Sequence, residues 1–230
     1  LLQKHQRSHL LARSWGTGTA ALEALADALG APPIGTDDQT SSRPLELPQG
    51  RLTKEKAAMV LAALQPENAI VIDESVTSGG AYYPLTAAAA PHSLLTLTGG
   101  SLGMGMPAAL GAALARPDRP VISFQADGSA MYTVQALWSQ AREGLNITTL
   151  ICANRSYDIL KLELMRAGNV QPGKNTLSLT DLGHPSLQWS GIAEGMGVPA
   201  VSVETAELLI AELRRALYEP GPHLIEMVLP

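Results

Sequence analysis

Two short polar motifs follow apolar runs in this sequence, and their residue types could hold a metal ion and a phosphate group. Asp127-Gly128-Ser129 follows one run, and Asn154 follows the next. A carboxylate and an amide oxygen are hard ligands of the kind that Mg²⁺ prefers when it shares its shell with phosphate oxygens and water. Gly128 would let the backbone approach a phosphate closely, and Ser129 offers a hydroxyl and an N–H at the start of a helix. We therefore predict a site for a metal ion and a diphosphate.

Simpler interpretations exist for each motif alone. An Asp-Gly-Ser after a strand is commonly a turn with a helix cap, and an Asn in that position is equally ordinary. A third corner favours a ligand, because the glycine-rich segment at 98–107 also lies between an apolar run and a helical pattern. Three strand-to-helix corners thus carry Gly, Asp or Asn where a ligand would lie.

The elements that must position these motifs alternate along the chain. Short apolar runs are separated by segments with helical periodicity, which is typical of parallel strands joined by right-handed crossovers. We predict a doubly wound α/β fold, with a mainly parallel sheet of about six strands and helices on both faces. Ligands of such sheets bind beyond the carboxyl ends of the strands, where the motifs would lie. The predicted strands are 69–73, 94–98, 121–124, 147–152, 200–203 and 223–228, and the predicted helices are 53–64, 103–115, 132–142, one beginning near 157, 186–196 and 206–218.

Composition excludes several classes of protein. The chain of 230 residues carries a net charge of −5 and has no cluster of basic residues, so we expect no nucleic-acid partner. Its single cysteine excludes a disulfide scaffold and a zinc site made of cysteines. No apolar run is long enough to span a membrane, and the first residues lack a signal peptide and do not begin with Met. We expect a piece of a longer cytoplasmic protein.

Proline and polar residues between 31 and 50 indicate a linker. We therefore predict that residues 1–40 are the end of a preceding, middle domain with its linker, and that 41–230 form a C-terminal domain. The long segment at 168–183, with mixed polarity and no clear period, is predicted to be a loop or a lid.

The two motifs together resemble the cofactor motif of the thiamine diphosphate (ThDP) enzymes, the group of acetolactate synthase, pyruvate decarboxylase and benzoylformate decarboxylase. In that motif Gly-Asp-Gly is followed, some two dozen residues later, by Asn-Asn. Asp127 matches the Asp, and Asn154, 27 positions later, matches the final Asn. Ala126 and Ala153 replace the first Gly and the first Asn, but neither position supplies the metal-binding atom in the family, so we expect cofactor binding to survive. The resemblance runs from about 52 to 230.

The resemblance implies a role for each residue of the two motifs. Asp127 and Asn154 would be ligands of Mg²⁺, and the carbonyl oxygen of Ser156 would be the third protein ligand. Gly128 and Ser129 would contact the diphosphate. This makes the C-terminal domain the part that binds ThDP and Mg²⁺.

The family also bends its cofactor around an apolar side chain. The glycine-rich segment aligns so that Leu102 is this wedge and the carbonyl of Gly100 accepts a hydrogen bond from the aminopyrimidine; without the resemblance, Leu102 is as readily a core leucine. Ser75 and Thr77 align with a second diphosphate-contacting loop, although such residues after a strand commonly only cap a helix.

No catalytic residue is assigned within this chain. Family members activate ThDP through a glutamate on a different domain, and we expect that glutamate outside this chain. Glu74 could be suggested for this role, but it lies in the loop on the diphosphate side. Ile159 and Leu160 are candidate walls of the substrate pocket, or else simply pack their helix.

The resemblance implies an enzyme that decarboxylates a 2-oxo acid, and that can ligate the product to a carbonyl acceptor, as a lyase or a transferase. Partners would be the 2-oxo acid and the N-terminal pyrimidine-binding domain of a second subunit, in a homodimer or homotetramer, with FAD possible in a domain not present here. This chain alone would be inactive. One alternative is a catalytically inactive ThDP-binding regulatory or scaffolding subunit. Another is a nucleotide-binding domain, but the glycines at 99–105 do not fit its pattern.

Overall fold

A computed structural model describes residues 18–31, 45–168 and 171–230 of the protein. The domain boundary predicted at residue 40 lies outside the described residues, so the division into domains stays a prediction. Helix α1 (Gly18–Ala28) belongs to a separate unit of the chain and is described by itself. Its leucines Leu22 and Leu25 are exposed, and it is followed by Gly30 with a left-handed φ of 60°.

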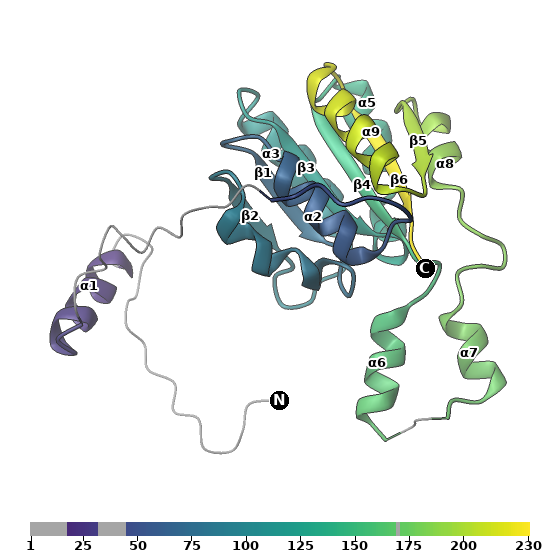
Figure 1. The fold of residues 1–230 in the computed structure, drawn as a ribbon, viewed down its shortest axis with the longest axis horizontal. Coiled ribbons are helices and arrows are strands. Elements are labelled where there is room, and N and C mark those ends of the chain that lie inside the picture. Colours follow the sequence, from purple (N-terminus) through teal and green to yellow (C-terminus); the bar gives the residue numbers. More distant parts are fainter. Residues whose placement is uncertain (1–17, 32–44, 169–170) are drawn as a thin grey trace. The chain divides into compact units, whose positions relative to one another are not determined.

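The larger unit is built on one six-stranded sheet in the order β2-β1-β3-β4-β6-β5, with every neighbouring pair parallel (Figure 1). This confirms the predicted doubly wound α/β fold. The strands are β1 (Ile70–Glu74), β2 (Ser93–Thr96), β3 (Val121–Ala126), β4 (Ile147–Ala153), β5 (Ala200–Val203) and β6 (His223–Val228).

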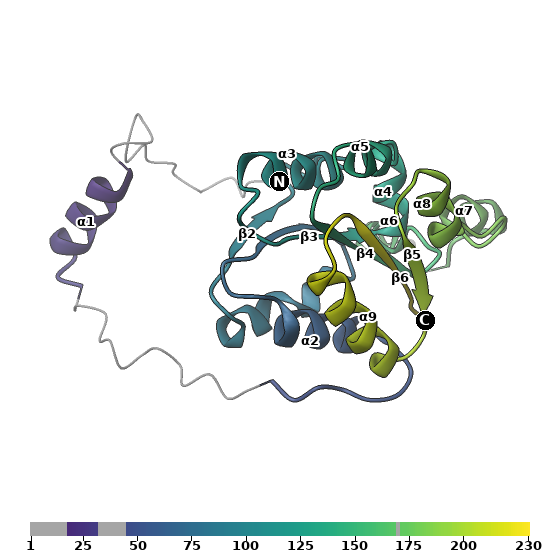
Figure 2. The same cartoon turned by 90° about the horizontal axis from the view of Figure 1, so that it is seen from above.

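Helices cover both faces of the sheet. Helices α2 and α9 pack together on one face, and α3, α5 and α8 lie on the other (Figure 2). The α-helices of this unit are α2 (Lys54–Leu64), α3 (Gly105–Ala115), α4 (Asp127–Ala130), α5 (Ala136–Arg142), α6 (Asp158–Arg166), α7 (Lys174–Thr180), α8 (Trp189–Gly195) and α9 (Ala206–Tyr218), and short 3₁₀ helices are η3 (Gly79–Ala81), η4 (Tyr83–Ala88) and η5 (Met131–Thr133).

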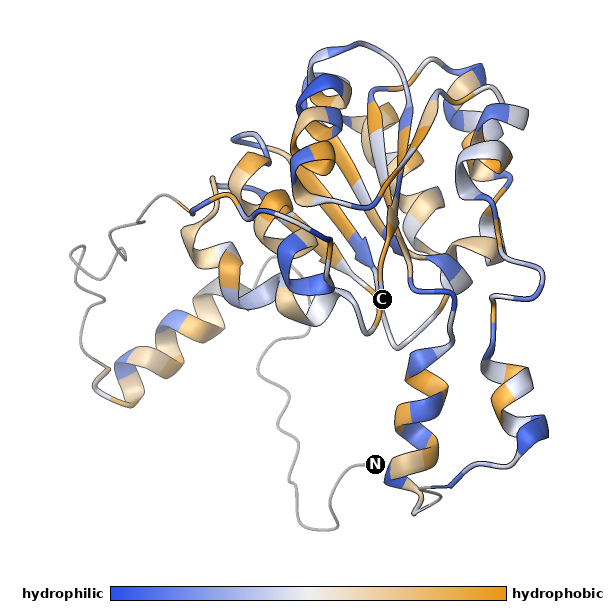
Figure 3. Cartoon of the chain, turned by 45° about the vertical axis from the view of Figure 1, so that its right-hand side comes forward, coloured by the Kyte–Doolittle hydropathy of each residue, from blue (hydrophilic) through white to orange (hydrophobic). Residues whose placement is uncertain are grey.

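The central strands are hydrophobic because helices shield both of their faces. Every residue of β1 and β4 is buried, and the hydropathy colouring shows these strands as largely apolar (Figure 3). Side-chain caps fix where the two helices of one face begin. Thr53 accepts from the N–H of Lys56 at 3.3 Å, and Thr205 accepts from the N–H of Leu208 at 3.4 Å.

The strand order creates a crevice at the carboxyl edge of the sheet. From β1 the chain passes to its neighbour β2 on one side, and from β3 it passes to its neighbour β4 on the other side. The connections therefore diverge between β1 and β3, and such a divergence leaves room for a ligand beyond the strand ends. The loops after β1, β3 and β4 all meet there.

Two predicted segments differ from the structure. The helix predicted at 132–142 is divided into η5 and α5. The segment 168–183, predicted to be a loop or lid, contains α7, which lies beside α6 beyond the carboxyl edge (Figure 1). Helix α7 has little local signal because only its last residue, Thr180, is buried. None of the helices in the described ranges is long and apolar enough to cross a membrane.

Candidate functional site

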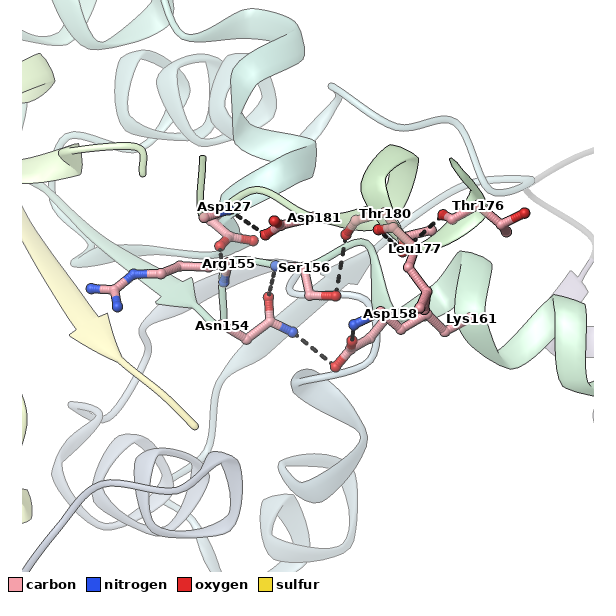
Figure 4. Close-up of polar contacts among 11 residues, drawn as sticks. Asp127, Asn154, Arg155, Ser156, Asp158, Lys161, Thr176, Leu177, Thr180 and Asp181 are labelled. Atoms are coloured by element: carbon pink, nitrogen blue, oxygen red, sulfur yellow. Dashed lines mark hydrogen bonds and ion pairs between the residues drawn. The ribbon is translucent and has the colours of Figure 1, made fainter. Parts of the chain in front are cut away.

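Asp127 lies at the carboxyl end of β3, as the first residue of α4, and is only 2% exposed. Its Oδ1 accepts from the N–H of Gly128 at 2.8 Å, and its Oδ2 accepts from the N–H of Arg155 at 2.7 Å (Figure 4). Burial raises the pKa of Asp127 to about 6 in spite of these bonds, and the negative charge of Asp158 adds to the rise. A buried carboxylate with a raised pKa is suited to binding a cation, which would stabilise its negative charge.

Asn154 follows β4, the neighbour of β3 in the sheet. Its Oδ1 accepts from the N–H of Ser156 at 3.1 Å, and its Nδ2 donates to Asp158 Oδ2 at 3.1 Å (Figure 4). Asp158 in turn pairs with Lys161 at 3.3 Å. Because the N–H of the residue after Asn154 reaches Asp127, the two predicted metal-binding corners are in direct contact.

Ser156 is held by a segment far along the chain. It forms an isolated antiparallel bridge with Asp181, and its hydroxyl donates to the carbonyl of Thr180 at 3.3 Å. The residue before it, Arg155, has a left-handed φ of 56°, which turns the backbone sharply between Asn154 and Ser156. The loop from Asn154 to Ser156 is thus held by the turn at Arg155 and by the contacts with Thr180 and Asp181. The role of the Ser156 carbonyl as a metal ligand stays a prediction.

Gly128 and Ser129 are buried at the start of α4. A Cβ on Gly128 would lie 2.4 Å from Cε1 of Tyr157, so only glycine fits beneath this ring. The hydroxyl of Ser129 donates to the carbonyl of Glu74 at 3.0 Å and lies 3.1 Å from that of Ala126. That hydroxyl is therefore engaged with the protein, which leaves the backbone of this corner for a phosphate.

The two residues predicted after β1 differ in their surroundings. Ser75 is fully buried, and its N–H and hydroxyl both donate to Asp73 Oδ1, so it does not face the crevice. Thr77 does line it. Between them Val76 has a φ of 52°, a left-handed conformation that is strained for a β-branched residue.

The glycine-rich corner between β2 and α3 presents Leu102 with 41% of its surface exposed. Gly103 follows with a φ of 93°, and a Cβ there would lie 2.8 Å from Cβ of Tyr132. Gly100 also has a left-handed φ, of 73°, and is exposed. Leu102 is therefore placed in the crevice by a backbone turn that glycine makes possible.

One cavity brings most of the predicted residues together. Seven of the nine residues predicted to bind cofactor or metal line it, and Ser75 and Gly100 do not. Of the two candidate walls of the substrate pocket, Ile159 lines it and Leu160 does not. No group of three or more His, Cys, Asp or Glu within the described ranges could hold a metal, so a cation here would depend on amide, carbonyl and phosphate oxygens as well. The cavity is lined by Val76, Thr77, Leu102, Ala126, Asp127, Gly128, Ser129, Asn154, Ser156, Tyr157, Asp158 and Ile159.

Sequence reasoning did not find the structural roles of three residues that shape this site. Tyr157 covers Gly128, and Asp158 accepts from the amide of Asn154, but Tyr and Asp are ordinary residue types at the start of a helix. Glu74 is 1% exposed, and its carboxylate accepts from the backbone N–H groups of Gly103 and Gly105, so it is not free to act on a ligand. The position of Glu74 at the end of a strand, beside the predicted loop, is the feature of the sequence that could indicate this role.

Comparisons with known proteins show which family the chain resembles. Residues 77–227 match the family model of the thiamine pyrophosphate enzyme C-terminal TPP binding domain. A protein of Mycobacterium tuberculosis named "Putative acetolactate synthase large subunit IlvX" is 52% identical over 223 residues. A benzoylformate decarboxylase of Pseudomonas aeruginosa is 36% identical over 183 residues. The structure of a thiamine diphosphate-dependent 4-hydroxybenzoylformate decarboxylase of Rhodococcus jostii RHA1 superposes with a TM-score of 0.72 at 30% identity.

The chain spans less than half the length of each of these relatives. The matches cover 96%, 77% and 91% of this chain, but 43%, 32% and 39% of the M. tuberculosis, P. aeruginosa and R. jostii proteins.

Proposed function

Since the chain belongs to the thiamine pyrophosphate enzymes, as a C-terminal TPP binding domain, we propose that it is the cofactor-binding part of an enzyme that decarboxylates a 2-oxo acid. Ligation of the product to a carbonyl acceptor is part of the same proposal, because relatives include both a decarboxylase and acetolactate synthases. The observation that carries the proposal is the contact between the corners of Asp127 and Asn154 at the carboxyl edge of the sheet.

The oxygen atoms at this contact suit Mg²⁺. Asp127 would contribute its carboxylate, Asn154 its Oδ1 and Ser156 its carbonyl oxygen, and the diphosphate with water would complete the octahedral shell. A cation would offset the cost of burying Asp127, whose pKa is raised by that burial. The residues present therefore fit the metal.

The remaining residues suit a diphosphate and an organic ring system. Gly128 and the N–H groups around it border the cavity from one corner, and Thr77 borders it from another. Leu102 offers an exposed apolar surface between them, which we assign to the rings of ThDP. The carbonyl of Gly100 would be the acceptor for the aminopyrimidine, although Gly100 does not line this cavity. Ile159 lines the same cavity from α6 and is a candidate wall for the substrate.

ThDP, when bound, supplies the electron sink that stabilises charge as CO₂ leaves the substrate. The chain's part is to bind the cofactor, hold it and exclude water. The activating glutamate is assigned to the N-terminal pyrimidine-binding domain of a second subunit, in a homodimer or homotetramer, because Glu74 is buried and bonded to the backbone. If the enzyme binds FAD, we assign it to a further domain and not to this one.

Calorimetric titration with ThDP tests this proposal. The chain should bind ThDP in the presence of Mg²⁺, weakly without its partner domain, and not in EDTA. Asp127→Ala should abolish the Mg²⁺-dependent binding and leave the circular dichroism spectrum unchanged. NAD serves as the control for the nucleotide-binding alternative, and unchanged ThDP affinity in Asp127→Ala would refute the site.

A further inference from the structure

Glu74 connects the end of β1 to the glycine-rich corner through both of its carboxylate oxygens. Oε1 accepts from the N–H of Gly103, and Oε2 accepts from the N–H of Gly105. The N–H of Gly103 belongs to the peptide group that follows Leu102. The carboxylate therefore fixes the orientation of the backbone directly beside Leu102.

The same residue also contacts the corner that follows β3. Its carbonyl oxygen accepts from the hydroxyl of Ser129 at 3.0 Å. The corner between β2 and α3 is packed tightly against Glu74, because a Cβ on Gly105 would lie 2.6 Å from Glu74 Oε2. One residue thus holds three corners of the cavity in a single arrangement.

This arrangement keeps a charged group away from water. Glu74 is 1% exposed, and burial raises its pKa although the two N–H groups oppose the rise. The ion pairs found among the described residues do not include Glu74. Burying a carboxylate whose partners are backbone N–H dipoles costs more free energy than the stability of a turn requires. Such a group is better suited to holding the turn in one geometry.

We propose that Glu74 is a positioning residue for the cofactor. It holds Leu102 so that this half-exposed side chain stands in the cavity before ThDP arrives and packs against the rings of the cofactor. Glu74 itself does not touch the ligand and acts through the backbone of Gly103 and Gly105. The inference rests on the proposed function, because it assigns the cavity to ThDP.

The test compares the affinities of Glu74→Gln for two ligands. Glutamine has nearly the same shape but can accept from only one of the two N–H groups, so the turn at Leu102 should loosen. Binding of ThDP with Mg²⁺ should weaken about tenfold, which corresponds to ~1.4 kcal/mol. Binding of inorganic pyrophosphate with Mg²⁺ should not change, since pyrophosphate has no rings for Leu102 to contact.

A double-mutant cycle with Leu102→Ala shows whether Glu74 acts through Leu102. Each single variant should weaken ThDP binding, and the double variant should be hardly weaker than either, because both changes remove the same contact. Glu226→Gln is the matched control. Glu226 is also a buried carboxylate, 4% exposed, but its Oε2 accepts from the N–H of Ser190 in α8, away from the cavity.

Unchanged ThDP affinity in Glu74→Gln, equal losses for ThDP and pyrophosphate, or full additivity with Leu102→Ala would overturn the inference while leaving the proposed function intact. Failure of the unmodified chain to bind ThDP would overturn both. If Glu74→Gln does not fold, Glu74→Asp provides the same test, because the shorter side chain keeps its charge but cannot reach both N–H groups.

Discussion

Replacing Asp127 by asparagine should remove the loss of stability that the chain suffers as the pH rises, and should abolish its response to metal. The carboxyl group is 2% exposed, and its pKa is raised by burial to about 6. A carboxyl group whose pKa is higher in the folded than in the unfolded chain takes up protons on folding. Its contribution to stability is fully present below the unfolded pKa, near 3.8, and is lost as the pH rises through about 6.

The size of this effect follows from the two pKa values. The difference between about 6 and 3.8, at about 1.4 kcal/mol for each factor of ten in proton affinity, corresponds to ~3 kcal/mol. The amide of the variant is uncharged at every pH, but its nitrogen cannot accept from one of the two N–H groups that the carboxylate binds, which adds a cost that does not depend on pH. We therefore expect the stability of Asp127→Asn, relative to the unmodified chain, to be up to ~3 kcal/mol greater at pH 7.5 than at pH 4.

Urea unfolding followed by tryptophan fluorescence measures this difference, since Trp189 is fully buried. Mg²⁺ with ThDP should raise the stability of the unmodified chain and leave that of the variant unchanged. Asp118→Asn is the control, because Asp118 lies in an exposed pair with Arg116 and should change stability by less than about 1 kcal/mol. A difference in stability between the two chains that does not change between pH 4 and pH 7.5 would refute the reasoning.

Three further changes test the packing around the site. Gly128→Ala places a methyl group 2.4 Å from the Tyr157 ring and should cost about 1–3 kcal/mol of unfolding free energy in urea, whereas Gly191→Ala, with its nearest neighbour at 3.9 Å, should be tolerated. Arg155→Gly removes a left-handed strain at φ 56° and should stabilise the chain by up to ~1 kcal/mol without weakening Mg²⁺ binding, because the N–H that reaches Asp127 is retained; a lower melting temperature would contradict this. Tyr83→Phe removes the hydroxyl that donates to Asp73 Oδ2 at 2.6 Å and should cost about 1–3 kcal/mol in the same urea assay, whereas Tyr218→Phe, at a residue 90% exposed, should have no effect.

The strands could be predicted from sequence because buried parallel strands are continuous apolar runs. The run at 147–152 became β4 (Ile147–Ala153), and that at 223–228 became β6 with the same bounds. Helix α7 could not be predicted, because the contacts that place it are distant in sequence. It is followed by Asp181, which bridges to Ser156, and its own side chains are mostly exposed.

The same distinction applies to the site: positions that follow a strand could be predicted, whereas contacts between distant residues could not. The end positions of Asp127 and Asn154 followed from the strand pattern, and the pairing of β3 with β4 confirmed that their corners are neighbours. The roles of these residues as ligands stay predictions. Glu74 was overlooked as a structural residue because the N–H groups that it binds lie 29 and 31 positions later in the chain. A contact of that range leaves no local pattern.

The order of the strands also bears on how this domain avoids unwanted self-association. An outermost strand exposes unpaired backbone groups that can template edge-to-edge aggregation, and a short edge limits this risk. Here β2 and β5 are the two outermost strands, and each has only four residues, fewer than β1, β3, β4 and β6 between them. The longer strands, whose exposed edges would aggregate more readily, lie inside the sheet, where both of their edges are paired.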